Sequence, residues 1–129
     1  MPYMNVRRVL FVSIALLGAL IALLQFFANT YYLYWEFWWY DVMMHFLGGL
    51  FISGGYLWIL MFEVPHTLRS RIPIFLSTLI VMCCVGVAWE VFEYLTDSFT
   101  AINYTLDTTL DLLMDITGAL VAYLIVKRI

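Results

Sequence analysis

Residues 9–28 have the sequence VLFVSIALLGALIALLQFFA, an apolar run that contains no charged side chain. A transmembrane helix needs about 20 such residues, and residues 42–62, 74–95 and 110–126 form three further runs that meet or approach this length. Of the 129 residues, 65% are hydrophobic and 12% are charged, whereas soluble domains are about half apolar and about a quarter charged. The sequence therefore predicts an all-α integral membrane protein, a four-helix transmembrane bundle forming one domain over residues 1–129.

Other classes of protein fit the composition poorly. The net charge of -3 leaves no basic surface for nucleic acid, so we expect membrane lipids and no nucleic acid as partners. Arg7 and Arg8 precede the first apolar run, as in a signal peptide, but the run is longer than a typical signal core. No small-x-small cleavage site follows it, since the sequence at residues 28–30 is Ala-Asn-Thr. We therefore expect the first run to be retained as a helix.

The basic residues predict the orientation of the bundle. They are Arg7, Arg8, Arg69, Arg71, Lys127 and Arg128. In a protein with four membrane crossings, all six lie on the same side of the membrane. Cytoplasmic loops carry an excess of Lys and Arg, so both termini and the connection at residues 63–73 are predicted to be cytoplasmic.

The acidic residues are concentrated on the other side of the predicted bundle. Of nine, only Glu63 falls on the basic side. The other eight are Glu36, Asp41, Glu90, Glu93, Asp97, Asp107, Asp111 and Asp115. His45 lies at the same depth, about one turn into the second predicted helix. Carboxylates and one imidazole thus gather in the outer half of the membrane.

The spacing of these residues places them on shared helix faces. Side chains three or four residues apart on a helix are neighbours, and three groups have this spacing: Asp41 with His45; Glu90 with Glu93; and Asp107 with Asp111 and Asp115. An ionised side chain near the bilayer centre costs about 2.5–3.5 kcal/mol on insertion scales. No Lys or Arg lies on this side to offset that cost. Shared protons, a water-filled cleft or a bound cation must therefore offset it.

A bound cation would make this cluster a metal site. Carboxylates with one imidazole suit Mg²⁺, Mn²⁺ or Ca²⁺, and also accommodate Zn²⁺ or Fe²⁺, so we expect a divalent metal of undetermined identity. The predicted ligands are His45, Glu90, Glu93, Asp111 and Asp115, with Asp107 as an outer-shell partner and Asp41 or His45 as a general base. The alternative is a network of protonated carboxyl groups that holds three helices together.

Residues 31–40 form a second unusual stretch, with the sequence YYLYWEFWWY. Tyr and Trp favour the membrane–water boundary, where the ring and its polar group both find suitable surroundings. The segment is therefore interpreted as an interfacial anchor between the first two helices. The alternative interpretation is a lid over a site for a lipid headgroup.

Short motifs in residues 41–119 resemble two membrane-protein families. The VanZ-like family is similar in the patterns Asp41-x3-His45, Glu90-x2-Glu93 and Asp111-x3-Asp115-x2-Gly118, although it usually has Gln at position 93 and Asn at position 115. The YjdF-like inner-membrane family is similar in Asp41…His45-Phe46-x2-Gly49 and in Asp107-Thr-Thr-Leu-Asp111 followed by Gly118-Ala119.

The resemblance implies a small helical protein of the bacterial inner membrane. The VanZ name is associated with teicoplanin resistance, which implies chemistry of the cell envelope outside the membrane. The two additional carboxylates, Glu93 and Asp115, favour a cation site in this chain. They also argue against carrying over a VanZ mechanism unchanged.

Three functions remain open at this point. The first is an enzyme that uses the metal site on a cell-envelope lipid or its headgroup. The second is a non-catalytic accessory or assembly subunit, in a homo-oligomer or a larger membrane complex. The third is proton or cation transport, which would require a polar path across the whole membrane.

Overall fold

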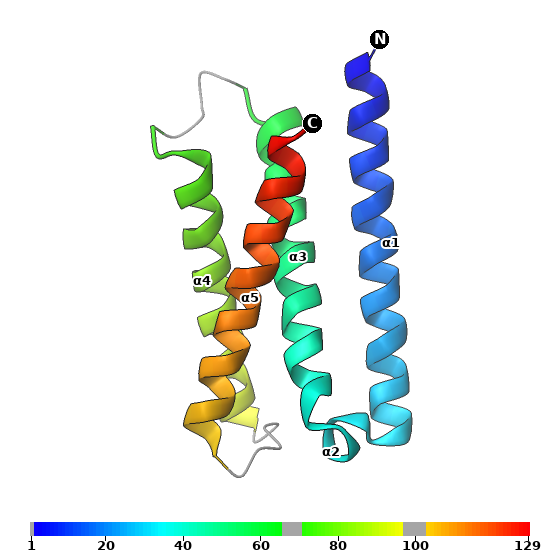
Figure 1. Cartoon of the computed structure of the whole chain (residues 1–129), viewed down its shortest axis with the longest axis vertical. Helices are drawn as coiled ribbons and strands as arrows, with labels where there is room; N and C mark the ends of the chain where they lie inside the picture. Colours follow the sequence, from blue (N-terminus) through cyan, green and yellow to red (C-terminus); the bar gives the residue numbers. More distant parts are fainter. Residues whose placement is uncertain (1, 66–70, 97–102) are drawn as a thin grey trace.

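The computed structural model describes residues 2–65, 71–96 and 103–129, so Arg69 and Asp97 lie outside the described residues. The elements are α1 (Pro2–Tyr31), α2 (Leu33–Glu36), α3 (Trp38–Phe62), α4 (Ile74–Thr96) and α5 (Tyr104–Lys127) (Figure 1). The four longer helices are long and apolar enough to cross a membrane. In a bilayer, a helix satisfies its own backbone polar groups, which is why the apolar runs are helical. The predicted all-α fold with four membrane helices is confirmed.

The helices are longer than the apolar runs that predicted them. Helix α5 begins at Tyr104 rather than near residue 110, because polar residues at its start stabilise the first turn. The Asn103 side chain caps the helix by accepting a hydrogen bond from the Leu106 backbone N–H at 3.3 Å. Asp107 lies in the first turn, where a negative charge interacts favourably with the helix dipole. The acidic residues of this segment are therefore inside the helix.

The aromatic segment at residues 31–40 is divided between three helices. Tyr32, with φ of 56°, adopts the left-handed conformation that ends α1 and turns the chain into α2. Phe37 is extended and separates α2 from α3, which begins at Trp38 rather than near residue 42. The Trp35 and Trp38 side chains are largely exposed, whereas Tyr40 is buried. Two exposed indoles at one end of the bundle suit an interfacial anchor.

Helix α3 is the centre of the bundle (Figure 1). Its most extensive contact is with α5, which also packs against α4. Helix α1 packs against α3 and α2, and within the described residues none of its Cα atoms lies within 8 Å of a Cα atom of α4 or α5. The outer helices α1 and α4 are thus separated by the central pair.

Two glycines allow the backbones of α3 and α5 to touch. A Cβ atom at Gly49 would collide with the backbone carbonyl of Asp115, and its distance from the Asp115 carbonyl carbon would be 2.8 Å. A Cβ atom at Gly118 would collide with the backbone oxygen of Phe46 and would lie 2.6 Å from the Leu50 nitrogen. Small residues at helix interfaces permit such approach in membranes. The crossing point lies beside Asp115, and so beside the acidic residues.

Polar contacts attach α1 to α3 at both ends. At one end Arg7 forms an ion pair with Glu63, and the Trp58 indole donates a hydrogen bond to the Arg7 carbonyl at 3.1 Å. At the other end the Tyr40 hydroxyl donates to the Leu24 carbonyl at 2.9 Å. These contacts hold α1 in place although, among the described helices, only α3 and the short α2 pack against it.

The two ends of the bundle have opposite charge. Both termini lie at the same end, together with the C-terminal end of α3 and the N-terminal end of α4 (Figure 1). The basic residues described there are Arg7, Arg8, Arg71, Lys127 and Arg128. The acids of α3, α4 and α5 lie toward the opposite end, where α2 is found. The predicted separation of charges is therefore present in the fold.

Candidate functional site

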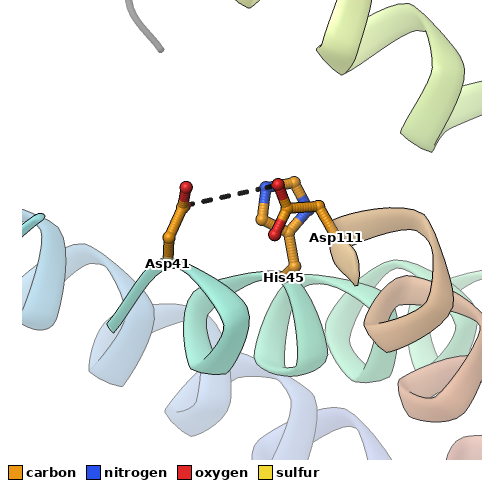
Figure 2. Close-up of side chains that lie close together, drawn as sticks. All are labelled: Asp41, His45 and Asp111. Atoms are coloured by element: carbon orange, nitrogen blue, oxygen red, sulfur yellow. Dashed lines mark ion pairs between the residues drawn. The ribbon is translucent and has the colours of Figure 1, made fainter. Parts of the chain in front are cut away.

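His45 lies among three aspartates from two helices. Its Nδ1 atom is 3.4 Å from Asp115 Oδ1, whereas its Nε2 atom is 3.8 Å from Asp41 Oδ1 and 4.0 Å from Asp111 Oδ2. Figure 2 shows Asp41 and His45 projecting from the same face of α3, with Asp111 reaching them from α5. The i, i+4 spacing on α3 explains why Asp41 lies beside His45. The glycine-mediated crossing of α3 and α5 explains the approach of Asp111 and Asp115.

Helix α4 adds two carboxylates to this cluster. Ligand atoms of His45, Glu90 and Glu93 all lie within 4.8 Å of one another. The ligand atoms of Asp41, His45 and Asp111 satisfy the same limit. Both groups include His45, so the cluster combines residues of three helices around one imidazole. We call this set the acidic cluster; it comprises Asp41, His45, Glu90, Glu93, Asp111 and Asp115.

Most of the acidic cluster is buried, and part of it has no polar partner. The exposed fractions are 7% for His45, 5% for Glu90, 1% for Asp111 and 4% for Asp115. Glu90 Oε1 and Asp111 Oδ1 have no hydrogen-bond partner among the described residues. Buried charge is costly unless it is paired or bound to a metal. The described Lys and Arg side chains are at the far end of the bundle, so they do not compensate it.

Two acids of the predicted set differ from the rest. Asp107 lies one turn before Asp111 and is only partly buried, and its carboxylate is not among the convergent ligand atoms. This position is compatible with the outer-shell place predicted for it. Glu36 is exposed on α2 and belongs to neither convergent group.

A cavity of about 410 Å³ adjoins the acidic cluster. Its walls come mainly from α1, α3 and α4, and most of the lining side chains are apolar. The polar lining residues include Asp41, His45, Glu93 and Asp115. The cluster therefore forms a polar wall of an otherwise apolar chamber, a combination typical of small-molecule sites.

Sequence reasoning missed two polar residues of this chamber. Gln25 of α1 and Tyr34 of α2 line the cavity, and the Tyr34 hydroxyl donates a hydrogen bond to Gln25 Oε1 at 2.5 Å. Burial raises the pKa of the Tyr34 phenol, and the nearby Asp41 carboxylate raises it further, so Tyr34 remains a neutral donor. Gln25 had a signal in the sequence, as an amide within an apolar run at the depth of the acids.

The fold and cluster define the class of protein, an integral membrane protein of four spanning helices with buried acids toward one end. The chain belongs to the family described as "Predicted membrane protein (DUF2238)", whose profile matches residues 3–129. Comparison with curated proteins and with solved structures gives no match.

Proposed function

We propose that the acidic cluster binds a divalent cation and that the bound cation acts on a cell-envelope lipid or its headgroup. One observation carries the proposal. Glu90 Oε1 and Asp111 Oδ1 are buried without a hydrogen-bond partner among the described residues, in a cluster with no Lys or Arg. A cation would supply the missing positive charge and would accept both oxygens as ligands.

The two nitrogen atoms of His45 suggest different roles for its neighbours. Nε2 faces Asp111, which would ligate the cation together with the imidazole, and Asp41, which stays free of the cation. Nδ1 faces Asp115, which would accept its N–H and so fix the ring orientation. Metal-bound histidines almost always have such a partner on their second nitrogen. We therefore assign Asp115 to orienting His45, and Glu90 and Glu93 to the remaining coordination.

The chemistry of such a site would be hydrolysis or group transfer at an oxygen-rich headgroup. A divalent cation lowers the pKa of bound water and polarises a phosphoryl or acyl oxygen. Asp41 is the most exposed of the three aspartates around His45, with 21% of its side chain accessible, so it is placed to act as a general base. Phosphate sites usually contain Arg or Lys. Here the cation alone would neutralise a phosphate.

The proposed location of the protein rests on its family, on its candidate membrane spans and on the resemblance of its motifs. Membership of a membrane-protein family and four candidate spans place the chain in a membrane. The resemblance to YjdF-like and VanZ-like proteins supports the bacterial inner membrane and a substrate of the cell envelope. A homo-oligomer or a larger complex remains compatible with the largely apolar, exposed faces of α1 and α4.

Metal analysis tests the proposal directly. Protein purified in lipid nanodiscs without chelator is expected to contain stoichiometric divalent metal by mass spectrometry. Chelator should lower its thermal stability, and adding back Mg²⁺, Mn²⁺ or Zn²⁺ should restore it, because ligands that bind only the folded state stabilise it. Protein that contains no metal and gains no stability from any of the three ions would contradict the proposal. The cluster would then be a protonated network, as expected of an accessory subunit.

The orientation of the bundle gives a separate prediction. Excess Lys and Arg mark the cytoplasmic side, so the end carrying both termini should face the cytoplasm. In a background with Cys83→Ser and Cys84→Ser, we expect a membrane-impermeant maleimide to label Glu36→Cys in intact spheroplasts. Ile129→Cys should react only after permeabilisation. The reverse pattern would show that the acidic cluster opens toward the cytoplasm.

A further inference from the structure

We propose that the cavity beside the acidic cluster holds the hydrocarbon chain of a phosphate-bearing membrane lipid. The placement of the headgroup rests on the proposed function, because the phosphate would be the external ligand of the cation. The placement of the chain rests on the cavity itself. The inference thus names the substrate class of the site.

The cavity has the lining expected for a lipid chain. Ile21, Phe51, Ile52, Met82 and Val85 contribute its apolar surface. Water would find few partners along these walls, since a buried water needs two to four polar groups. A chain would instead bury apolar surface against side chains of three helices.

The cavity can be entered from the side. Its walls include residues of α1 and of α4, yet within the described residues no Cα atoms of these two helices lie within 8 Å of each other. A lipid chain can therefore pass from the bilayer into the cavity between α1 and α4 without separating two packed helices. In a membrane, the molecules beside such an opening are lipids.

The length of the cavity corresponds to one leaflet. Its lining residues on α3 extend from Asp41 to Ile52, about 16 Å along the helix at about 1.5 Å per residue. On α4 they extend from Met82 to Glu93, the same distance. The hydrocarbon core of a bilayer is about 30 Å thick. A chain along these residues would thus span half of the bilayer, with its polar end at the acidic cluster.

Gly48 is a position at which a substituted side chain would enter the cavity without colliding with the protein. It lines the cavity, and a Cβ atom built on it would meet no other atom within 4 Å. A larger side chain at this position would project into the space assigned to the lipid chain. Gly55, two turns further along α3, is equally open but does not line the cavity. The pair offers a matched comparison on one helix.

The test compares Gly48→Leu with Gly55→Leu in nanodiscs of phosphatidylcholine that contain phosphatidylglycerol with a photoreactive diazirine in its acyl chain. After irradiation, peptides of α1 and α4 that line the cavity are quantified by mass spectrometry. We expect labelling to fall about tenfold in Gly48→Leu through lost apolar contact, and to be unchanged in Gly55→Leu. Bound metal should be the same in both. Chelator should lower labelling of the wild type as well.

The outcomes separate this inference from the proposed function. Equal labelling of the two variants, with metal retained, would overturn the lipid-chain assignment and leave the cation site standing. If the wild type contains no metal and Gly48→Leu still loses labelling, the proposed function and the headgroup placement would both be overturned. If Gly48→Leu does not fold, Ile52→Phe fills the same cavity and is judged by the same criteria.

Discussion

Asp111→Asn is expected to weaken metal binding about 100-fold while the four helices remain folded. Asn has nearly the same shape as Asp, and Asp111 Oδ1 has no hydrogen-bond donor to lose among the described residues. The substitution removes a negative ligand from a site whose affinity depends on charge. At metal concentrations of about 100 times the dissociation constant, the wild type should gain about 2.7 kcal/mol of stability. The variant should gain less than about 0.5 kcal/mol, given an affinity about 100-fold lower.

Two further variants sharpen this result. Glu36→Gln makes the same chemical change at an exposed acid outside the acidic cluster, so its metal content should match the wild type. Asp115→Asn changes the residue at His45 Nδ1 rather than a ligand, and should weaken binding less than Asp111→Asn does, by about 10-fold. The measurements are metal content and thermal unfolding with and without added ion.

The same variants also test the competing interpretation. If the cluster is a network of protonated carboxyl groups that joins helices, Asp111→Asn should lose stability whether or not metal is present. If a cation is the partner, the metal-free variant should be at least as stable as the metal-free wild type, because one buried negative charge is gone. Full metal content in Asp111→Asn would show that Asp111 is not a ligand.

Gly118→Ala is expected to separate α3 from α5 and to destabilise the bundle by about 1–3 kcal/mol. The added Cβ would meet backbone atoms of Phe46, Leu50 and Gly49, and a helix backbone has no rotamer by which to move aside. Separation would also carry Asp111 and Asp115 away from His45, so the variant should lose metal. The loss of stability should therefore exceed the loss caused by adding a methyl group at an uncrowded helix position.

Gly55→Ala is the matched control, since it adds the same methyl group to a site with no atom within 4 Å. Both variants can be compared by reversible unfolding in mixed detergent micelles. The control should be as stable as the wild type or slightly more so, because Ala is the better helix former. Equal stability of Gly118→Ala and Gly55→Ala would mean that the close crossing is not needed for folding.

Much of the candidate site could be predicted because spacing along a helix is a local property. Asp41 and His45 share a face whatever surrounds α3, and so do Glu90 and Glu93 on α4. The common depth of these residues follows from counting along apolar runs of similar length. The contribution of α1 could not be predicted in this way, because its apolar residues look alike on every side of the helix.

The sequence by itself determined the membrane class, the four helices and the separation of basic and acidic ends. Hydrocarbon requires each span to bond its own backbone, and this requirement acts on each apolar run separately. Only the tertiary structure decided that Asp115 faces Nδ1 of His45 while Asp41 and Asp111 face Nε2. It also decided that a cavity forms among α1, α3 and α4. In lipid, the buried and exposed faces of a helix are both apolar, so helix rotation is set by contacts such as Gly49 against Asp115 and Gly118 against Phe46.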